Sequence, residues 1–459
     1  MEITKELSQR CHDLDYKTLS EDVIDRVKYL LLDYIGVAAR GALSDSSRSV
    51  YNFILKLENG RHGAVVIGTN LKITPPYAAL ANGTAAHSLE LDDVVNEASL
   101  HPAVAIMPAA LATAQMTGCS GKDLIAAIVS GYEVAIKLGV ALDPASHYAQ
   151  GFHPTGTCGT LGAAVTAAKI LKLKQKALTS ALGIAGSQAA GSMEFLSDGA
   201  YTKRFHPGWA GHCGIVAALL AQENFNGPAT IIEGKFGFLH AYSPVSDAGK
   251  VLRDWGQPYE VMNTSIKPHA CCRYKQGPID GILKIMWENK LKGSDIEKVT
   301  LGILKAGFPL VAEPKKLKVN PRSVVDAQFS MPFGAAVAIL FGKATLDEYT
   351  IETINSFPVK EMMNRIHCVM DPDLEKEFPK KWPAFVNILT KAGHDFTIKI
   401  DYPKGDPQNP ITWDELINKF RNLTSPVYSG SQQNQIINKV RSLDQENDLD
   451  SFSLLLLKD

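Results

Sequence analysis

The chain has 459 residues, too many for one ordinary hydrophobic core, so its length predicts two domains. A formal net charge of -1, 45% hydrophobic and 21% charged residues are typical of a soluble globular protein and exclude a strongly basic binder of nucleic acid. The charged N-terminus and the lack of a long apolar stretch predict a cytoplasmic protein with no membrane partner. The cysteines are scattered and form no C-x-x-C pair, which predicts a reduced protein with neither a disulfide framework nor a zinc site.

Residues 1–264 are predicted to form helices. Ser20 caps a helix whose apolar side chains recur every three or four residues, and the small residues between 78 and 86 are typical of a buried helix. Further helices are expected over four ranges: 121–142, 157–171, 176–191 and 209–222. Because small side chains let helix axes approach closely, we expect a compact and mostly buried bundle.

The pattern changes near Thr264. Residues 298–304 alternate in polarity and carry β-branched side chains, which predicts a strand, and residues 326–341 are typical of a helix. Further strands are expected at 366–370, 385–390 and 396–400. This part of the chain therefore has the pattern of an α+β domain.

The C-terminal part returns to helical patterns. Residues 403–407 form a turn-rich link, and Thr412 begins a capping box that opens a helix, with two more helical stretches after it. We therefore expect a mainly α fold. Its all-helical domain combines residues 1–264 with residues 401–459, and the α+β domain of residues 265–400 is an insertion.

The first motif with chemical potential runs from His87 to His101 and contains Glu90, Asp92 and Asp93. It follows the small-residue helix. Ionisable groups at the end of a buried helix cost free energy unless they are paired or used, so this segment is the first candidate for acid/base chemistry. The alternative is a capped helix end followed by a solvated acidic loop.

The second motif places His153 at the start of a helix rich in Gly and Ala. The positive end of the helix dipole lowers the pKa of such a histidine and favours the neutral imidazole, which is the form that acts as a base. The alternative is a hydrogen-bonded histidine in the core.

Two further motifs carry cations. Lys203 and Arg204 precede a predicted helix start, where together they can hold an anion, or they belong to a solvated basic loop. Lys267, His269 and Arg273 follow the predicted domain boundary. Ligand sites favour such boundaries, and Lys267 and Arg273 can clamp a carboxylate. The alternative is an interdomain hinge with incidental charge.

Several familiar sites are missing from the sequence. It contains no dinucleotide fingerprint after a strand, no P-loop, no G-x-S-x-G and no H-E-x-x-H. The acidic and histidine positions match no standard metal spacing, so we expect neither a metal nor a cofactor. Cations, histidines and carboxylates together suit a small di- or tricarboxylate. Removal of a proton next to a carboxylate requires cations, a base, and an acid on the opposite side if a group leaves.

These four motifs together resemble the MmgE/PrpD family over essentially the full length of the chain: His87 to Asp93 with His101-Pro102, Gly151 to Pro154 with Gly159 to Gly162, Thr202 to Trp209, and Ile266 to Tyr274. The family includes 2-methylcitrate dehydratase, cis-aconitate decarboxylase and iminodisuccinate epimerase. The resemblance implies a helical domain built from both chain ends, an inserted α+β lid, a homodimer with its active site between the domains, and no metal or iron–sulfur cluster.

The resemblance also implies site residues. Functional positions of the decarboxylase branch match here at His101, His153, Lys203 and Lys267. The chain departs from that branch at four positions, which carry Glu90 for Asp, Val94 for Thr, Cys272 near a lid histidine and Phe308 near a tyrosine. These departures count against decarboxylation of cis-aconitate.

The sequence thus predicts a cofactor-independent lyase that dehydrates a 2-methylcitrate-like substrate. The expected catalytic residues are His101, His153, Asp92 and Asp93, and the expected substrate-binding residues are Glu90, Lys203, Lys267, His269 and Arg273. The alternatives are an epimerase or racemase of an iminodisuccinate-like substrate, a cis-aconitate-type decarboxylase, a carboxylate-binding sensor without catalysis, and, as a weaker rival, a metallohydrolase.

Overall fold

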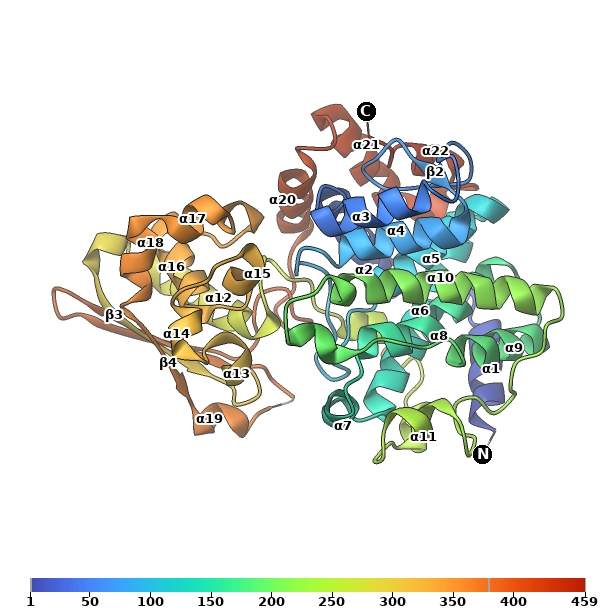
Figure 1. The fold of residues 1–459 in the computed structure, drawn as a ribbon, viewed down its shortest axis with the longest axis horizontal. Helices are drawn as coiled ribbons and strands as arrows, with labels where there is room; N and C mark the ends of the chain where they lie inside the picture. The colour runs from blue at the N-terminus through green and yellow to red at the C-terminus, as the bar shows by residue number, and fades with distance from the viewer. Residues whose placement is uncertain (1, 379, 459) are drawn as a thin grey trace. The chain divides into compact units, whose positions relative to one another are not determined.

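The computed structural model describes residues 2–378 and 380–458 and divides into two compact units (Figure 1). Unit 1 contains the chain up to Ser88, the segment Asp92–Thr264 and the chain from Thr412 onward. Unit 2 contains Leu89–Leu91 and Ser265–Ile411.

Unit 1 is helical, with a short two-stranded ribbon that the sequence patterns did not indicate. The ribbon pairs β1 (Ala64–Val65) antiparallel with β2 (Lys72–Ile73). The helices are α1 (Ile3–Asp13), α2 (Glu21–Gly41), α3 (Asp45–Ile54), α4 (Pro75–Ala86), α5 (Ala103–Thr117), α6 (Gly121–Ala141), α7 (Pro144–Ala149), α8 (Pro154–Ile170), α9 (Gln175–Gly186), α10 (Thr202–Gln222), α11 (Phe238–Tyr242), α20 (Trp413–Thr424), α21 (Gly430–Arg441) and α22 (Asp450–Leu454).

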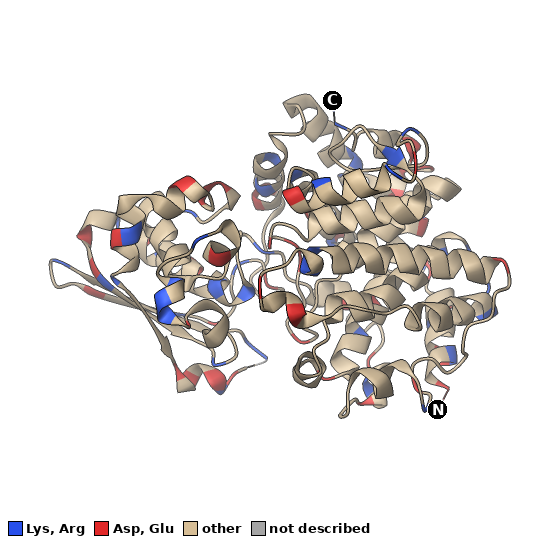
Figure 2. Ribbon diagram, in the orientation of Figure 1, with Lys and Arg blue, Asp and Glu red and all other residues tan. Residues whose placement is uncertain are grey.

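The centre of unit 1 is the packing of α10 against α4 and α8. Glycines permit it: a Cβ on Gly83 of α4 would lie 2.6 Å from the Cα of Gly208 on α10, and one on Gly214 would lie 2.5 Å from the Cβ of Ala163. Charged residues are scarce along these helices, and on α10 they are confined to the first turn (Figure 2). The packing brings the end of α4 and the starts of α8 and α10 together.

Helix α6 is long and apolar enough to cross a membrane by length and composition. However, 94% of its most apolar window is buried inside the protein. It is therefore the core helix of a globular unit, in agreement with the composition of the chain.

Unit 2 is an α+β unit whose four-stranded sheet has the order β4-β3-β5-β6. The strands are β3 (Ile296–Ile303), β4 (Ile366–Met370), β5 (Ala384–Thr390) and β6 (Asp395–Ile400), with β3 parallel to β4 and the other pairs antiparallel. The helices are α12 (Gln276–Glu288), α13 (Phe308–Val311), α14 (Lys315–Lys318), α15 (Val324–Gln328), α16 (Met331–Phe341), α17 (Ile351–Asn355), α18 (Phe357–Met363) and α19 (Pro372–Glu375). Alternate residues of β5 are buried, as the sequence pattern predicts.

Unit 2 ends at Ile411, beyond the domain boundary expected at residue 400. Asp406 explains the difference. Its carboxylate accepts hydrogen bonds from Ser265 and Arg273, and the Ile266 amide donates to the Gly405 carbonyl at 3.0 Å. The turn-rich link is thus fastened to the start of unit 2.

Three predicted helices have different limits in the structure. Helix α10 begins at Thr202 rather than at residue 209 and continues through Pro207, so Lys203 lies in its first turn and not in a loop before it. Helix α9 ends at Gly186, before the positive-φ Gly191. The helix predicted over 326–341 is two helices, because Ser330 caps α16 by accepting from the Phe333 amide.

Candidate active site

Four histidines of unit 1 form a continuous cluster. His87 follows the last residue of α4, His101 precedes α5, His153 stands just before the first residue of α8, and His206 lies in the second turn of α10. Ring centroids are 5.2 Å apart for His87 and His101, 5.7 Å for His87 and His153, and 5.3 Å for His153 and His206. Imidazoles gathered at this spacing can pass or receive protons on a molecule bound beside them.

Asp92 joins two of these rings through one oxygen. Its Oδ2 lies 2.7 Å from Nδ1 of His87 and 3.2 Å from Nδ1 of His101. Carboxylate and carbonyl oxygens only accept hydrogen bonds, so both Nδ1 atoms carry hydrogen: His87 donates to Asp92, and His101 donates to the backbone carbonyl of Asp93. Nε2 is then the second nitrogen of each ring, and the Nε2 of His87 is buried without a hydrogen-bond partner in the described part of the chain.

Asp93 has a different set of partners. Its carboxylate accepts from the amide of Ala103 at 3.0 Å and from the hydroxyl of Tyr132 at 2.8 Å, and its backbone carbonyl accepts from Nδ1 of His101. Burial raises the pKa of Asp93 to about 8, and the charge of Asp92 adds to this rise, while the hydrogen bond from Tyr132 opposes it. Asp93 therefore ties the motif loop to α5 and α6 and fixes the ring of His101.

His153 and His206 are joined directly, with their Nδ1 atoms 3.1 Å apart. Burial holds the pKa of His153 well below its ordinary value, and the charges of His87, His206 and Lys203 lower it further. Burial also lowers the pKa of His206 to about 4, with His87 and Lys203 contributing. Both rings are therefore neutral near pH 7, and Lys203 is close enough to act on both.

The other predicted residues belong to unit 2. One terminal nitrogen of Arg273 donates to both oxygens of Asp406, at 2.7 and 2.6 Å, and the guanidinium lies over the ring of Trp382. His269 is fastened similarly, because its Nε2 lies 2.9 Å from a carboxylate oxygen of Asp280. These contacts make Arg273 and His269 braces of unit 2, and their binding of substrate stays a prediction.

Glu90 and Lys267 complete the set in unit 2. Glu90 has a positive φ of 55°, in a short segment held by the Gln328 side chain, which donates to the carbonyl of Leu89 at 2.9 Å. Burial raises the pKa of Cys272 to about 11, with a contribution from the charge of Glu90, so these two residues are close. Lys267 is buried, at 2% exposure, in the segment that precedes Arg273.

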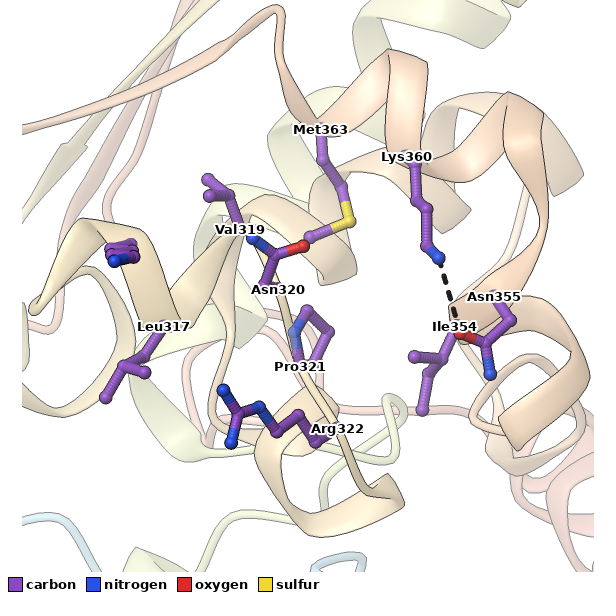
Figure 3. A pocket seen from close by; sticks show the side chains of 10 residues that line it. Leu317, Val319, Asn320, Pro321, Arg322, Ile354, Asn355, Lys360 and Met363 are labelled. Carbon is purple, nitrogen blue, oxygen red and sulfur yellow. Dashed lines mark hydrogen bonds between the residues drawn. The ribbon is translucent and has the colours of Figure 1, made fainter.

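A separate hollow of about 470 Å³ lies in unit 2 between the α14 segment and helices α17 and α18 (Figure 3). Its charged lining residues are Lys316, Arg322 and Lys360, and the last donates to Asn355 at 3.3 Å. No predicted site residue lines it. Within residues 2–378 and 380–458, no group of three His, Cys, Asp or Glu side chains is arranged to hold a metal ion.

Comparison with known proteins agrees with the motifs. The MmgE/PrpD N-terminal domain matches residues 5–249, and the MmgE/PrpD C-terminal domain matches residues 269–445. The chain belongs to the MmgE/PrpD family. The predicted resemblance and the mainly α fold are thereby confirmed.

Curated relatives match nearly the whole chain. Cis-aconitate decarboxylase from Homo sapiens is 28% identical over 99% of this chain and 94% of its own length, and that from Aspergillus terreus is 26% identical over 99% and 96%. The 2-methylcitrate dehydratase of Escherichia coli is 22% identical over 92% of this chain and 90% of its own length. The prediction that this MmgE/PrpD protein is a lyase is confirmed by these relatives.

The structure brings together five of the predicted residues of this MmgE/PrpD protein in unit 1: Asp92, Asp93, His101, His153 and Lys203. Three further residues belong to the same cluster although no role was predicted for them: His87, His206 and Tyr132. His87 and His206 stand inside the motifs and could have been added from them. Tyr132 lies within the apolar helix α6, and no pattern marks it.

Proposed function

We propose that this protein is a lyase for a small tricarboxylate and that its reaction is the dehydration of a 2-methylcitrate-like substrate. One observation carries the proposal. The cluster contains two kinds of proton-transfer group: His153, neutral and buried, and His101, whose Nδ1 lies 3.2 Å from the Asp92 carboxylate. Elimination of water requires both a base and an acid.

His153 is the proposed base. Its lowered pKa keeps the imidazole neutral, so it is ready to remove the hydrogen next to a carboxylate. Lys203 lies beside it and supplies the positive charge that stabilises the negative charge developing on that carboxylate.

His101 is the proposed acid. Its Nδ1 donates to the Asp93 carbonyl, and the Asp92 carboxylate, 3.2 Å from the same nitrogen, stabilises the imidazolium that forms when Nε2 also carries hydrogen. The ring can then protonate a departing hydroxyl group. Asp92 and Asp93 act through His101 in this scheme and are positioning residues.

Decarboxylation of a cis-aconitate-like substrate is the second candidate, because the decarboxylases match 99% of the chain at 26–28% identity and the dehydratases match 92% at 21–22%. Loss of carbon dioxide leaves a carbanion that needs one proton, so a single acid suffices. The second proton-transfer group favours dehydration. Epimerisation also uses two such groups but releases nothing. The homodimer and the cytoplasmic location stay predictions.

Proton NMR of the purified protein in deuterated water tests the proposal. The substrates are citrate, 2-methylcitrate, cis-aconitate and an aspartate-derived imine. Loss of water to an alkene supports dehydration, itaconate establishes decarboxylation, and hydrogen exchange alone establishes epimerisation. His153→Gln is expected to lower kcat/KM about a hundredfold or more, since His153 is the base. The control is His240→Asn, an exposed histidine of α11.

A further inference from the structure

The contact between His153 and His206 limits how their protons are placed. The two Nδ1 atoms are 3.1 Å apart, and a hydrogen bond between two nitrogens contains one hydrogen. One ring therefore donates from Nδ1 and the other accepts at Nδ1. Because each neutral imidazole carries a single N–H, the Nε2 atoms have opposite states, one protonated and the other bare.

The surroundings keep both rings neutral. Burial is the main cause of the lowered pKa of both His153 and His206, and the charges of His87 and Lys203 lower both further. In the described part of the chain, neither ring forms an ion pair with a carboxylate, unlike His87 and His101. His153 and His206 are thus two neutral rings of opposite tautomer, and they lie beside His87 and His101, which contact the carboxylate of Asp92.

The two rings differ in exposure. His153 is buried, at 3% exposure, whereas His206 is half-buried and in reach of water. Glycines surround the contact: a Cβ on Gly191 would lie 3.4 Å from Nδ1 of His206, and one on Gly156 would lie 3.3 Å from its Cβ. At these distances an added methyl group at Gly191 would be in ordinary contact with the His206 ring and one at Gly156 would press on the His206 Cβ, so the backbone packs closely around this pairing.

We propose that His206 is a positioning residue and proton relay for His153, which sets whether His153 acts as base or acid. The inference rests on the proposed function. In the base-ready state, His153 carries its hydrogen on Nδ1 and His206 carries its hydrogen on Nε2.

The relay balances its protons. Nε2 of His153 takes a proton from the substrate carbon, the Nδ1 proton of His153 passes to Nδ1 of His206, and His206 loses its Nε2 proton to water. Both rings end neutral with exchanged tautomers, and His153 now carries hydrogen on Nε2 and is ready to act as an acid. The base is restored when Nε2 of His153 gives its proton to water after the product has left, the Nδ1 proton of His206 returns to Nδ1 of His153, and Nε2 of His206 takes a proton from water. A buried base thereby exchanges its proton with water without leaving its place.

His206→Asn tests the relay, because an amide keeps a hydrogen bond to His153 but passes no proton. We expect kcat to fall about tenfold to a hundredfold, with KM changed about twofold or less. His212→Asn, a substitution further along α10, is the control and is expected to keep the wild-type kcat. A wild-type kcat and pH profile in His206→Asn would overturn the relay and leave a packing role.

Nitrogen NMR of histidine-labelled protein tests the pairing without any substrate. The signals of His153 and His206 are assigned from the variants that lack them. Opposite tautomers of His153 and His206 support the inference, whether or not the protein turns over any of the tested tricarboxylates. A failure to turn over these substrates would count against the proposed function alone. Hydrogen on Nε2 of both rings would overturn the inference.

Discussion

Tyr132 donates its hydroxyl hydrogen to Oδ2 of Asp93 across 2.8 Å, inside the core of unit 1. Both side chains are buried, and the pKa of Asp93 is raised to about 8, mainly by that burial. At neutral pH the carboxyl group is therefore mostly protonated. The two neighbouring aspartates therefore differ: Asp92 lies against the imidazole ring of His101, whereas Asp93 braces the loop that carries His101.

Asp93→Asn is expected to remove a pH dependence of stability. The pKa of Asp93 rises from 3.8 to about 8 on folding, so between these pH values the folded state binds a proton that the unfolded state lacks. The contribution of Asp93 to stability therefore falls as the pH rises from 3.8 to about 8. The amide has no such titration. The stability of the variant relative to wild type should therefore improve with pH, by at most about 1.4 kcal/mol per pH unit. Urea unfolding at a mildly acidic and a mildly alkaline pH measures this, and an equal difference at both would contradict it.

Asp92→Asn is expected to lower kcat about a hundredfold or more, because the neutral amide lacks the negative charge that stabilises the imidazolium of His101. KM should change far less, since Asp92 acts through histidines. Steady-state kinetics measure both. Asp123→Asn, which alters the first turn of α6, is the control. A kcat within twofold of wild type in Asp92→Asn would remove the carboxylate from the mechanism.

Gly83→Ala tests the close approach of α4 and α10. The added methyl group would lie 2.6 Å from Gly208 Cα and 2.7 Å from the carbonyl oxygen of Val104, so backbone must move. We expect a loss of about 1–3 kcal/mol in the free energy of unfolding. Gly430→Ala at the start of α21 meets nothing within 4 Å and is the matched control. Equal stability of the two variants, measured by denaturant unfolding, would be inconsistent with the packing described.

Asp406→Ala tests the brace in unit 2. Removal of one partner of a buried ion pair leaves the charge of Arg273 poorly compensated, which costs about 3–5 kcal/mol. Asp406→Asn keeps an acceptor for Ser265 and should cost less. The control is Asp373→Ala, which breaks an exposed pair with Lys376 and should leave stability almost unchanged. If the melting temperature of Asp406→Ala matches wild type, the pair is not a brace.

Local patterns were sufficient for most elements. The alternation in residues 298–304 and 385–390 gave strands β3 and β5 because one face of each strand is buried. Helix α10 was predicted too short because Pro207 is normally a helix boundary, and here it lies inside the helix. Residues 401–411 were predicted to belong to the helical domain, but they belong to unit 2. Their turn residues give no sign of the ion pair between Asp406 and Arg273 that holds them there.

The candidate site was predictable in its residue types but not in its pairing. His87 and His206 stand in the motifs, yet sequence does not say which ring meets which, because the contacts join α4, α8 and α10 through tertiary packing. Tyr132 was invisible for a related reason: a tyrosine in an apolar helix is typical of a core side chain, and only the fold reveals that its hydroxyl group meets Asp93.

Hydrogen exchange in deuterated water, followed by proton NMR, tests the division of labour between His153 and His101 most directly. The substrate is the tricarboxylate that the panel identifies. His101→Gln keeps the base and loses the acid, so it should exchange the hydrogen next to the carboxylate while forming almost no alkene. His153→Gln should do neither. Exchange at the wild-type rate in His153→Gln would contradict the account.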